Sequence, residues 1–286
     1  MSNDATTMLP AQQQLEALTQ AALGVARRAG ERILDVYQSD FEITEKADAT
    51  PLTTADLEAN KVIIEGLRSF DYDAPVLSEE SPPVALDERR SWSTYWLVDP
   101  LDGTREFIRR SGEFTVNIAL INGCEPCLGV VYAPVQGVAY FASHNNGAWK
   151  QHDSETTATR INVRTAPSSD VVVARSRAPV TGPSMKVFLE KLGQHKEVAM
   201  GSSLKSCLVA EGTADVYARL GPTSEWDTGA AQCIVEEAGG QITDLKMREL
   251  RYNTRESLIN PHFFVTGKSS HNWSDYLPPE LLEQTG

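Results

Sequence analysis

Apolar residues recur every three to four positions over residues 12–37, with Leu15 and Leu18 early in the series. This spacing is the period of an amphipathic helix, so the pattern predicts a long first helix. The N-cap residues within 51–56 indicate the start of a second helix, which we expect to run to about Phe70. Two helices should therefore precede the rest of the fold.

After the second helix the pattern changes to short runs of β-branched and aromatic residues. Gly, Pro and Asn residues separate these runs, and the combination is typical of consecutive strands joined by turns. The expected strands are residues 74–77, 95–98, 114–121, 128–135 and 138–141. A meander of strands should therefore follow the two helices.

The second half of the chain alternates between strand-like and helix-like segments. Strands are expected at 171–174, 214–217 and 241–243, and helices at 183–192, 203–211 and 227–238. This alternation favours layered α and β structure. The polar stretch 152–160 is the best candidate boundary, so we expect two closely packed halves, residues 1–155 and 156–286, rather than two independent domains.

The charge balance limits the partners. The 286 residues include 39 acidic and 26 basic side chains, which give a formal net charge of −13, and the basic residues are not clustered, so nucleic acid is not expected to bind. The longest apolar runs, such as 128–135, fall short of the roughly 18 residues that span a bilayer. The first 14 residues lack the features of a secretory signal. We expect a cytoplasmic protein; loose association with the cytoplasmic face of the membrane and the oligomeric state stay open.

The sequence lacks the motifs of several other phosphate-handling and metal-dependent enzymes. It contains no G-x-x-x-x-G-K-[ST], no G-x-G-x-x-G and no H-E-x-x-H. Cys124 and Cys127 form a C-x-x-C pair between two expected strands, without a second pair or a nearby His, so we interpret the segment as a hairpin rather than a zinc site. The sequence therefore gives no indication of nucleotide binding through a P-loop or a Rossmann turn, and none of zinc catalysis.

Two acids three positions apart directly follow one of the apolar runs. Pro100 stiffens the turn between them and Gly103 permits a backbone conformation closed to other residues, so Asp99, Asp102 and the Leu101 carbonyl can converge on one point. Hard oxygen ligands that converge on one point suit Mg²⁺ or Mn²⁺. An acidic surface turn is the alternative interpretation of this segment taken alone.

Two further acids favour the metal interpretation. Glu79 also follows an apolar run, and Asp227 begins an expected helix, where an Asp is more often a simple cap. Two carboxylates about 4 Å apart repel by roughly 4 kcal/mol at an effective dielectric of 20. A cluster of carboxylates without bound cations would therefore repel an anionic substrate. Bound cations reverse the local charge and attract phosphate. The pattern therefore indicates metal-assisted hydrolysis of a phosphate ester.

Three segments, 99–107, 226–231 and 238–240, resemble the two signatures of the inositol monophosphatase superfamily of Mg²⁺-dependent, lithium-sensitive phosphatases. The segments that resemble its CysQ branch of 3'(2'),5'-bisphosphate nucleotidases are 77–80, 112–118, 130–134 and 201–205. The resemblance covers nearly the whole chain. It implies an α+β fold, the layered αβαβα sandwich, and removal of the 3'-phosphate of adenosine 3',5'-bisphosphate in sulfur assimilation to give AMP.

The resemblance also implies roles for individual residues. The implied metal ligands, for two or three Mg²⁺ ions or for Mn²⁺, are Glu79, Asp99, the Leu101 carbonyl, Asp102 and Asp227. The implied catalytic residues are Asp56, Glu79 and Thr104, with Asp56 paired to Thr104 to orient the attacking water. The implied substrate-binding residues are Glu79, Leu101, Asp102, Gly103, Thr104, Ser202, Lys205, Arg219 and Asp227.

Three residues depart from the pattern of the branch. Arg105 stands where Lys is common, Arg177 where His is frequent, and Gly229 where Ala is usual. These departures leave the implied metal ligands intact and bear on nucleotide contacts and substrate preference, including that for 3'-phosphoadenylyl sulfate. Two alternatives stay open: a phosphatase of inositol 1-phosphate or another small sugar phosphate, and a non-catalytic sensor of phosphorylated nucleotides. The sensor is disfavoured because the water-activating residues are all present.

Overall fold

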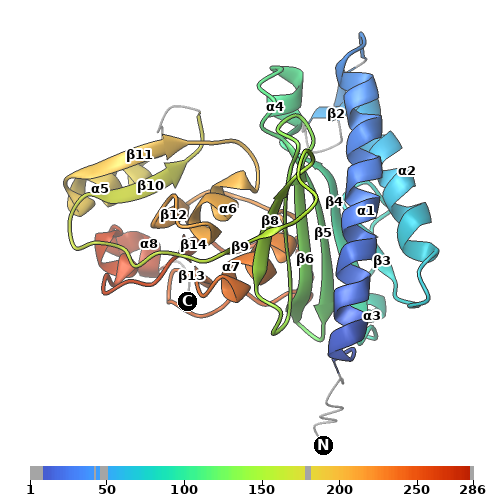
Figure 1. The fold of residues 1–286 in the computed structure, drawn as a ribbon. Helices are drawn as coiled ribbons and strands as arrows, with labels where there is room; N and C mark the ends of the chain where they lie inside the picture. The colour runs from blue at the N-terminus through green and yellow to red at the C-terminus, as the bar shows by residue number, and fades with distance from the viewer. Residues whose placement is uncertain (1–8, 42, 46–50, 178–181, 284–286) are drawn as a thin grey trace, which may run out of the picture.

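The computed structural model describes residues 9–41, 43–45, 51–177 and 182–283, and Figure 1 shows their arrangement in layers. The first eight residues, part of the segment in which we expect no secretory signal, lie outside this range. None of the described helices combines the length and the apolar character needed to cross a membrane.

Two helices form the outer layer on one side of the molecule (Figure 1). They are α1 (Gln12–Tyr37) and α2 (Thr54–Arg68), as the spacing of apolar residues predicts. Between them in the chain, β1 (Ile43–Glu45) and β2 (Pro51–Thr53) pair as a small antiparallel ribbon. The expected pair of helices is therefore confirmed.

The second layer is a seven-stranded sheet whose strands neighbour one another in chain order. Its first two strands are parallel and all later neighbours are antiparallel, so the expected meander is confirmed. The short helix α3 (Leu86–Arg89) lies between the first two strands in the chain. The strands are β3 (Val76–Ser78), β4 (Thr94–Asp102), β5 (Thr115–Asn122), β6 (Glu125–Ala133), β7 (Val138–Ser143), β8 (Ala148–His152) and β9 (Thr159–Ile161).

The last two strands of this sheet were not expected from the sequence. β8 and β9 lie at one end of the sheet and are mostly polar or partly exposed, so they lack the apolar run that marks the central strands. The expected boundary between residues 155 and 156 falls in the connection between β8 and β9, and β9 still belongs to the larger sheet. The division into two halves stays a prediction.

Alternate residues of the central strands pack on opposite faces of the large sheet. On β4, Trp96 and Val98 join the core beneath α1 and α2, whereas Tyr95 and Leu97 join the core on the other face. Because both faces are covered, the strand is apolar throughout instead of alternating with polar residues. This explains why the central strands appear in the sequence as continuous apolar runs.

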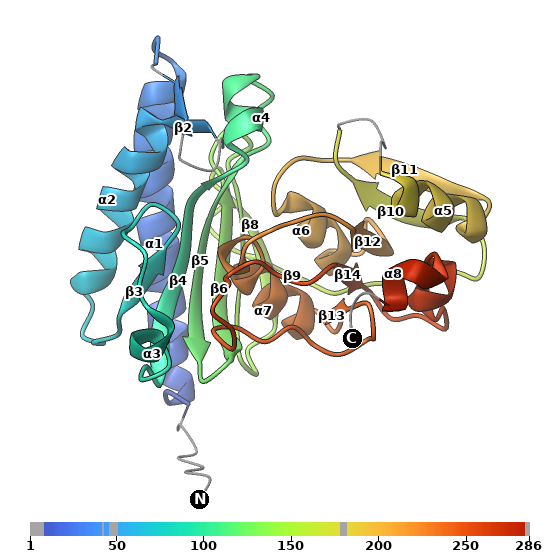
Figure 2. The same cartoon turned by 180° about the vertical axis from the view of Figure 1, so that it is seen from behind.

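The middle layer consists of two helices that lie between two sheets (Figure 2). α7 (Gly229–Glu237) packs against β5, β6 and β7 and also against the smaller sheet, while α6 (Leu204–Ala210) packs on α7 and on β10, β12 and β14. The smaller sheet has the order β11-β10-β12-β14-β13. Its strands are β10 (Val171–Arg175), β11 (His195–Ala199), β12 (Val216–Arg219), β13 (Gln241–Asp244) and β14 (Phe263–Thr266).

The fifth layer covers the outer face of the smaller sheet. It contains α5 (Pro183–Leu192), the 3₁₀ turn η2 (Trp273–Tyr276) and α8 (Pro279–Glu283). Phe188 of α5 and Trp273 pack there with Phe264 of β14 in a separate core cluster. The order of layers is therefore helices, sheet, helices, sheet, helices, and the expected αβαβα sandwich is confirmed.

Gly129 on β6 marks the closest approach between the large sheet and the middle layer. A Cβ atom at this position would lie 2.2 Å from the carbonyl oxygen of Ala230 on α7. We predict that Gly129→Ala lowers the free energy of unfolding by about 2 kcal/mol, because the backbone of α7 would have to move. Urea unfolding measures this change.

Gly182→Ala is the matched control, since nothing lies within 4 Å of a Cβ atom at that position. This variant should change the free energy of unfolding by less than about 0.5 kcal/mol. Equal stability of the two variants would contradict the close packing of α7 on β6.

Candidate active site

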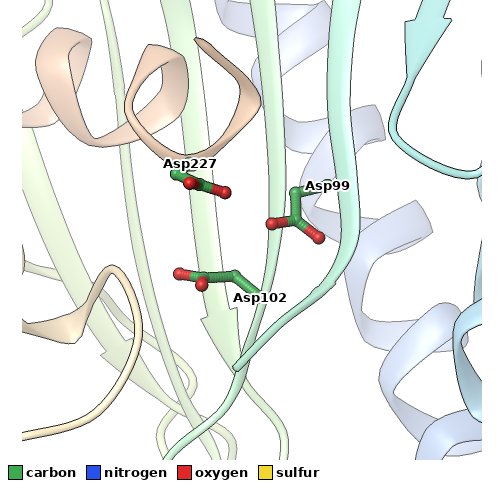
Figure 3. Close-up of side chains that lie close together, drawn as sticks. All are labelled: Asp99, Asp102 and Asp227. Atoms are coloured by element: carbon green, nitrogen blue, oxygen red, sulfur yellow. The ribbon is translucent and has the colours of Figure 1, made fainter. Parts of the chain in front are cut away.

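Three aspartates from distant parts of the chain lie together between the large sheet and the middle layer (Figure 3). Asp99 and Asp102 come from β4, and Asp227 is the last residue of the 3₁₀ turn η1 (Glu225–Asp227), just before α7. One carboxylate oxygen of each lies within 4.8 Å of those of the other two. The structure therefore brings together three of the expected metal ligands.

β4 bends at the point where its two acids leave the sheet. Asp99 is paired with Asn117 of β5, and the next pair joins Asp102 to Thr115, so β4 has one residue more than β5 between these pairs. Such a β-bulge bends the strand and redirects its side chains. Asp99 Oδ1 also accepts a hydrogen bond from the Leu101 N–H over 3.0 Å. The bulge thus turns two carboxylates of one strand towards the same place.

Gly103 ends this strand in a left-handed conformation, with φ of 97°. It caps the short helix α4 (Thr104–Ile108), which is the helical turn expected after the acids, and Phe107 anchors that turn in the core. A side chain at residue 103 would be strained at this φ. Glycine therefore lets the chain reverse direction directly beside the carboxylates.

Asp102 is held by Ser203, which immediately precedes α6. The Ser203 N–H and hydroxyl both donate to Asp102 Oδ2, over 2.6 Å and 2.7 Å. The Ser203 hydroxyl in turn accepts from the amide of Asn117, whose own oxygen accepts from the Thr115 hydroxyl. Ser203 was not predicted as a site residue from the sequence, because only the fold brings the start of α6 to the end of β4.

Asp56 lies at the start of α2 and contacts the first residue of α4. The Thr53 N–H and hydroxyl donate to Asp56 Oδ2 over 2.8 Å and 2.6 Å, which forms a capping box. The other carboxylate oxygen accepts the Thr104 hydroxyl over 3.3 Å. The pair implied by the family resemblance is therefore in direct contact, and Asp56 is buried.

The electrostatics of the cluster favour a bound cation. Burial raises the pKa of Asp99 well above its usual value, and the carboxylates of Glu79, Asp102 and Asp227 raise it further. Burial, with repulsion from Asp102, raises the pKa of Asp227 to about 7. Glu79 follows β3, and its N–H donates to the Val98 carbonyl over 3.1 Å. Clustered carboxylate oxygens with raised pKa values are the donor set that a divalent metal fits.

A pocket of about 300 Å³ opens beside Asp102 and Asp227. Its lining combines these acids and Gly103 with basic side chains, namely Arg105, Arg109, Lys205 and Arg219. Ser202, Ser203 and Ser176 also line it. Four of the residues expected to bind substrate, Gly103, Ser202, Lys205 and Arg219, are therefore gathered in one pocket with the acids.

Two of these basic groups are held in place by backbone carbonyls. Lys205 is buried, and its Nζ donates to the Ser202 carbonyl over 2.6 Å and lies 5.3 Å from the centre of the Tyr217 ring. Burial lowers the pKa of Lys205. Arg219 Nη2 donates to the Pro222 carbonyl over 2.8 Å. Both cations are thereby fixed before any ligand binds.

The three departures from the family pattern have distinct surroundings. Arg105 lines the pocket. Arg177 pairs with Glu113 instead of facing the pocket. At Gly229, a Cβ atom would lie 2.9 Å from the Leu97 side chain, so glycine suits the close packing of α7 on β4.

A layered αβαβα fold with a carboxylate cluster beside a basic pocket defines a class of metal-dependent phosphatases. The model of the inositol monophosphatase family matches residues 14–273, and the chain belongs to this family. It is 50% identical over 244 residues to the 3'(2'),5'-bisphosphate nucleotidase CysQ of Salmonella typhimurium, covering 85% of this chain and 96% of that protein. The Escherichia coli K12 protein of the same name is 48% identical with the same coverage.

A solved structure agrees with this family membership. The crystal structure of CysQ from Bacteroides thetaiotaomicron, a bacterial member of the family, matches with a TM-score of 0.79 and 39% sequence identity. The match covers 90% of this chain and 99% of that one.

We predict that Mg²⁺ raises the unfolding temperature of the metal-free protein by about 5 °C at saturation, because a cation offsets the repulsion within the cluster. In the folded protein the pKa of Asp227 is raised from 3.8 to about 7, so its ionisation opposes folding. Without Mg²⁺, stability should therefore fall as the pH rises through this range. Calorimetry at several pH values, with Mg²⁺ or EDTA, measures both effects.

Asp99→Asn should remove most of this Mg²⁺ effect, because it removes the buried charge at the centre of the cluster. Asp71→Asn, which changes an exposed acid beyond the end of α2, should leave the effect intact. A full Mg²⁺ effect in the Asp99 variant would contradict the assignment.

Proposed function

We propose that this protein is a metal-dependent 3'(2'),5'-bisphosphate nucleotidase that converts adenosine 3',5'-bisphosphate to AMP and phosphate. The observation that carries the proposal is the pocket, in which two acids of the cluster, Asp102 and Asp227, and four basic side chains line the same space. Such a pocket suits a substrate with one phosphate to be hydrolysed and a second to be held. The names of the relatives at about half identity support the same activity.

We assign the metal site to Glu79, Asp99, the Leu101 carbonyl, Asp102 and Asp227, as a site for two or three Mg²⁺ ions, with Mn²⁺ as a substitute. Supporting this assignment, the three aspartates lie within reach of one another, and Asp99 is buried among acids. Divalent ions at such a site lower the pKa of water and offset charge on the phosphoryl group. The protein's own contribution is to hold the oxygens in place.

In this proposal Asp56 and Thr104 orient the attacking water. One oxygen of Asp56 accepts two hydrogen bonds from Thr53, and the other accepts the Thr104 hydroxyl. Because that hydroxyl donates its proton to Asp56, its free lone pairs can accept a hydrogen bond from water. The water then presents its own lone pair to phosphorus, and its proton can pass towards Asp56 or Glu79.

The remaining residues would hold the two ends of the substrate. Gly103 and Thr104, at the start of α4, are placed beside Asp102 and would contact the phosphate that is cleaved. Ser202, Lys205 and Arg219 would bind the second phosphate. Lys205 supports this role because a buried ammonium gains from a nearby dianion.

A phosphatase of inositol 1-phosphate or another small sugar phosphate is the main alternative, since it would use the same carboxylates. Such a substrate would leave Lys205 and Arg219 without a second phosphate, so the basic lining favours the bisphosphate. A non-catalytic sensor would not need the contact between Asp56 and Thr104, which is present. Activity on 3'-phosphoadenylyl sulfate, the link to sulfur assimilation and a cytoplasmic location stay predictions.

We predict that adenosine 3',5'-bisphosphate is hydrolysed with a kcat/KM about 100-fold above that for inositol 1-phosphate, because the second phosphate gains two charge-assisted hydrogen bonds. Phosphate release from both esters and from 3'-phosphoadenylyl sulfate, each with Mg²⁺ and with EDTA, measures this preference. EDTA should abolish all turnover. A clear preference for the inositol ester would overturn the assigned substrate.

We further predict that Asp102→Asn lowers kcat by about 1,000-fold or more without unfolding the protein. Asparagine keeps the size of the side chain and can still accept a hydrogen bond from Ser203, but it removes a charged oxygen ligand. Steady-state kinetics measures the loss of kcat, and circular dichroism tests whether the variant stays folded. Near-normal activity would refute the role of Asp102, and Asp71→Asn should be fully active.

A further inference from the structure

Glu113 connects two segments of the second half of the chain to the loop between α4 and β5. Its side chain is buried, and its Oε2 accepts the Gly201 N–H over 2.9 Å and Arg177 Nε over 2.7 Å. Arg177 Nη2 also donates to Oε1. A bidentate pair is geometrically specific, and here Glu113 is 8% exposed whereas Arg177 is 57% exposed. Glu113 therefore fixes the chain after β10 and the chain before α6 to the same point.

The contact between Glu113 and Gly201 leaves no room for a side chain at residue 201. A Cβ atom there would lie 2.5 Å from the Glu113 carbonyl oxygen and 2.8 Å from the Glu113 Cβ. Because one of these neighbours is backbone, a change of rotamer could not relieve the clash. The position of Gly201 is thus set by Glu113.

The residues that follow Gly201 face the pocket. Ser202 has a left-handed φ of 47°, and its carbonyl accepts the hydrogen bond from Lys205 Nζ. Ser203 is held separately by Asn117 of β5. A shift of Gly201 would therefore move Ser202 and the head of Lys205 first, while Asp102 would keep its partner Ser203.

We propose that the Arg177–Glu113 ion pair positions the turn at Gly201 and Ser202 and thereby sets how tightly the pocket holds the phosphate that is not cleaved. The proposal rests on the proposed function, because it assigns Ser202 and Lys205 to that phosphate. Arg177 and Glu113 are positioning residues: the pocket is lined by the neighbouring Ser176 but by neither of them.

The chain contains a matched control for this ion pair. Arg175, two residues before Arg177, donates to Glu197 Oε2 over 2.5 Å. This second Arg–Glu pair joins β10 to β11. Arg175 Nη1 also donates to the Ser176 carbonyl over 2.9 Å. Arg175→Gln therefore removes a second Arg–Glu pair, at the end of β10, and leaves the hydrogen bond between Glu113 and Gly201 in place.

The kinetic test compares Glu113→Gln, Arg177→Gln, the double variant and Arg175→Gln. The first two should each raise the KM for adenosine 3',5'-bisphosphate about 10-fold, with kcat changed less than about 3-fold. The KM for adenosine 3'-monophosphate, which lacks the second phosphate, should change little. The double variant should be no worse than either single variant, because both act through one contact. Arg175→Gln should behave as wild type.

A different result would identify Arg177 as a direct phosphate ligand. In that case Glu113→Gln would free the guanidinium and leave the KM unchanged or lower, while Arg177→Gln alone would raise it. That outcome, or an unchanged KM in both variants, would overturn the proposal.

Hydrogen exchange of the peptide 200–206, in the enzyme without substrate, tests the turn independently of activity. The Gly201 amide is bonded to Glu113, so this peptide should exchange about 10-fold faster in Glu113→Gln and Arg177→Gln and unchanged in Arg175→Gln. Unchanged exchange in all variants would overturn the proposal. If wild-type enzyme did not prefer the bisphosphate over the 3'-monophosphate, the proposed function would fail, and the exchange result would still decide whether the ion pair fixes the turn.

Discussion

Mutual repulsion among Asp99, Asp102 and Asp227 is the constraint around which the rest of the site is built. Two such charges about 4 Å apart repel by roughly 4 kcal/mol at an effective dielectric of 20, so they would separate on a flexible loop. Secondary structure and hydrogen bonds hold the three carboxylates close together in this protein. A bulge turns β4 at the two acids, Ser203 donates twice to Asp102, and Asp227 is fixed by its hydrogen bond from the Ser224 N–H.

The layered fold supplies these supports because both middle helices begin at the cluster. α6 begins directly after Ser203, and α7 begins just after Asp227 and Thr228. The free N–H groups of a helix start favour nearby negative charge, and the Ser203 N–H on Asp102 is the direct example here. The start of α7 also packs closely on the large sheet, against Gly129 of β6 and, through Gly229, against Leu97 of β4.

The helices, strands and site residues that the sequence predicts are those marked by a pattern of neighbouring residues in the chain. α1, α2 and the central strands have regular apolar patterns, and the aspartates of β4 directly follow an apolar run. The polar edge strands β8 and β9, the half-exposed β11 and the four-residue β14 were missed, because short or mixed runs do not distinguish strand from loop or helix. Ser203 and Glu113 were missed because their partners lie far away in the sequence.

The distribution of charge in the pocket explains how a chain with a net charge of −13 can accept a doubly phosphorylated substrate. The carboxylates repel phosphate unless cations are bound, whereas the Lys205 ammonium and the Arg219 guanidinium attract it. Under the proposed function, the second phosphate of a bisphosphate would lie at Lys205 and Arg219, and its other phosphate would lie beside Gly103 and Thr104. Because Asp102 and Asp227 share one lining with Lys205 and Arg219, a single pocket can serve both phosphates once cations offset the carboxylates.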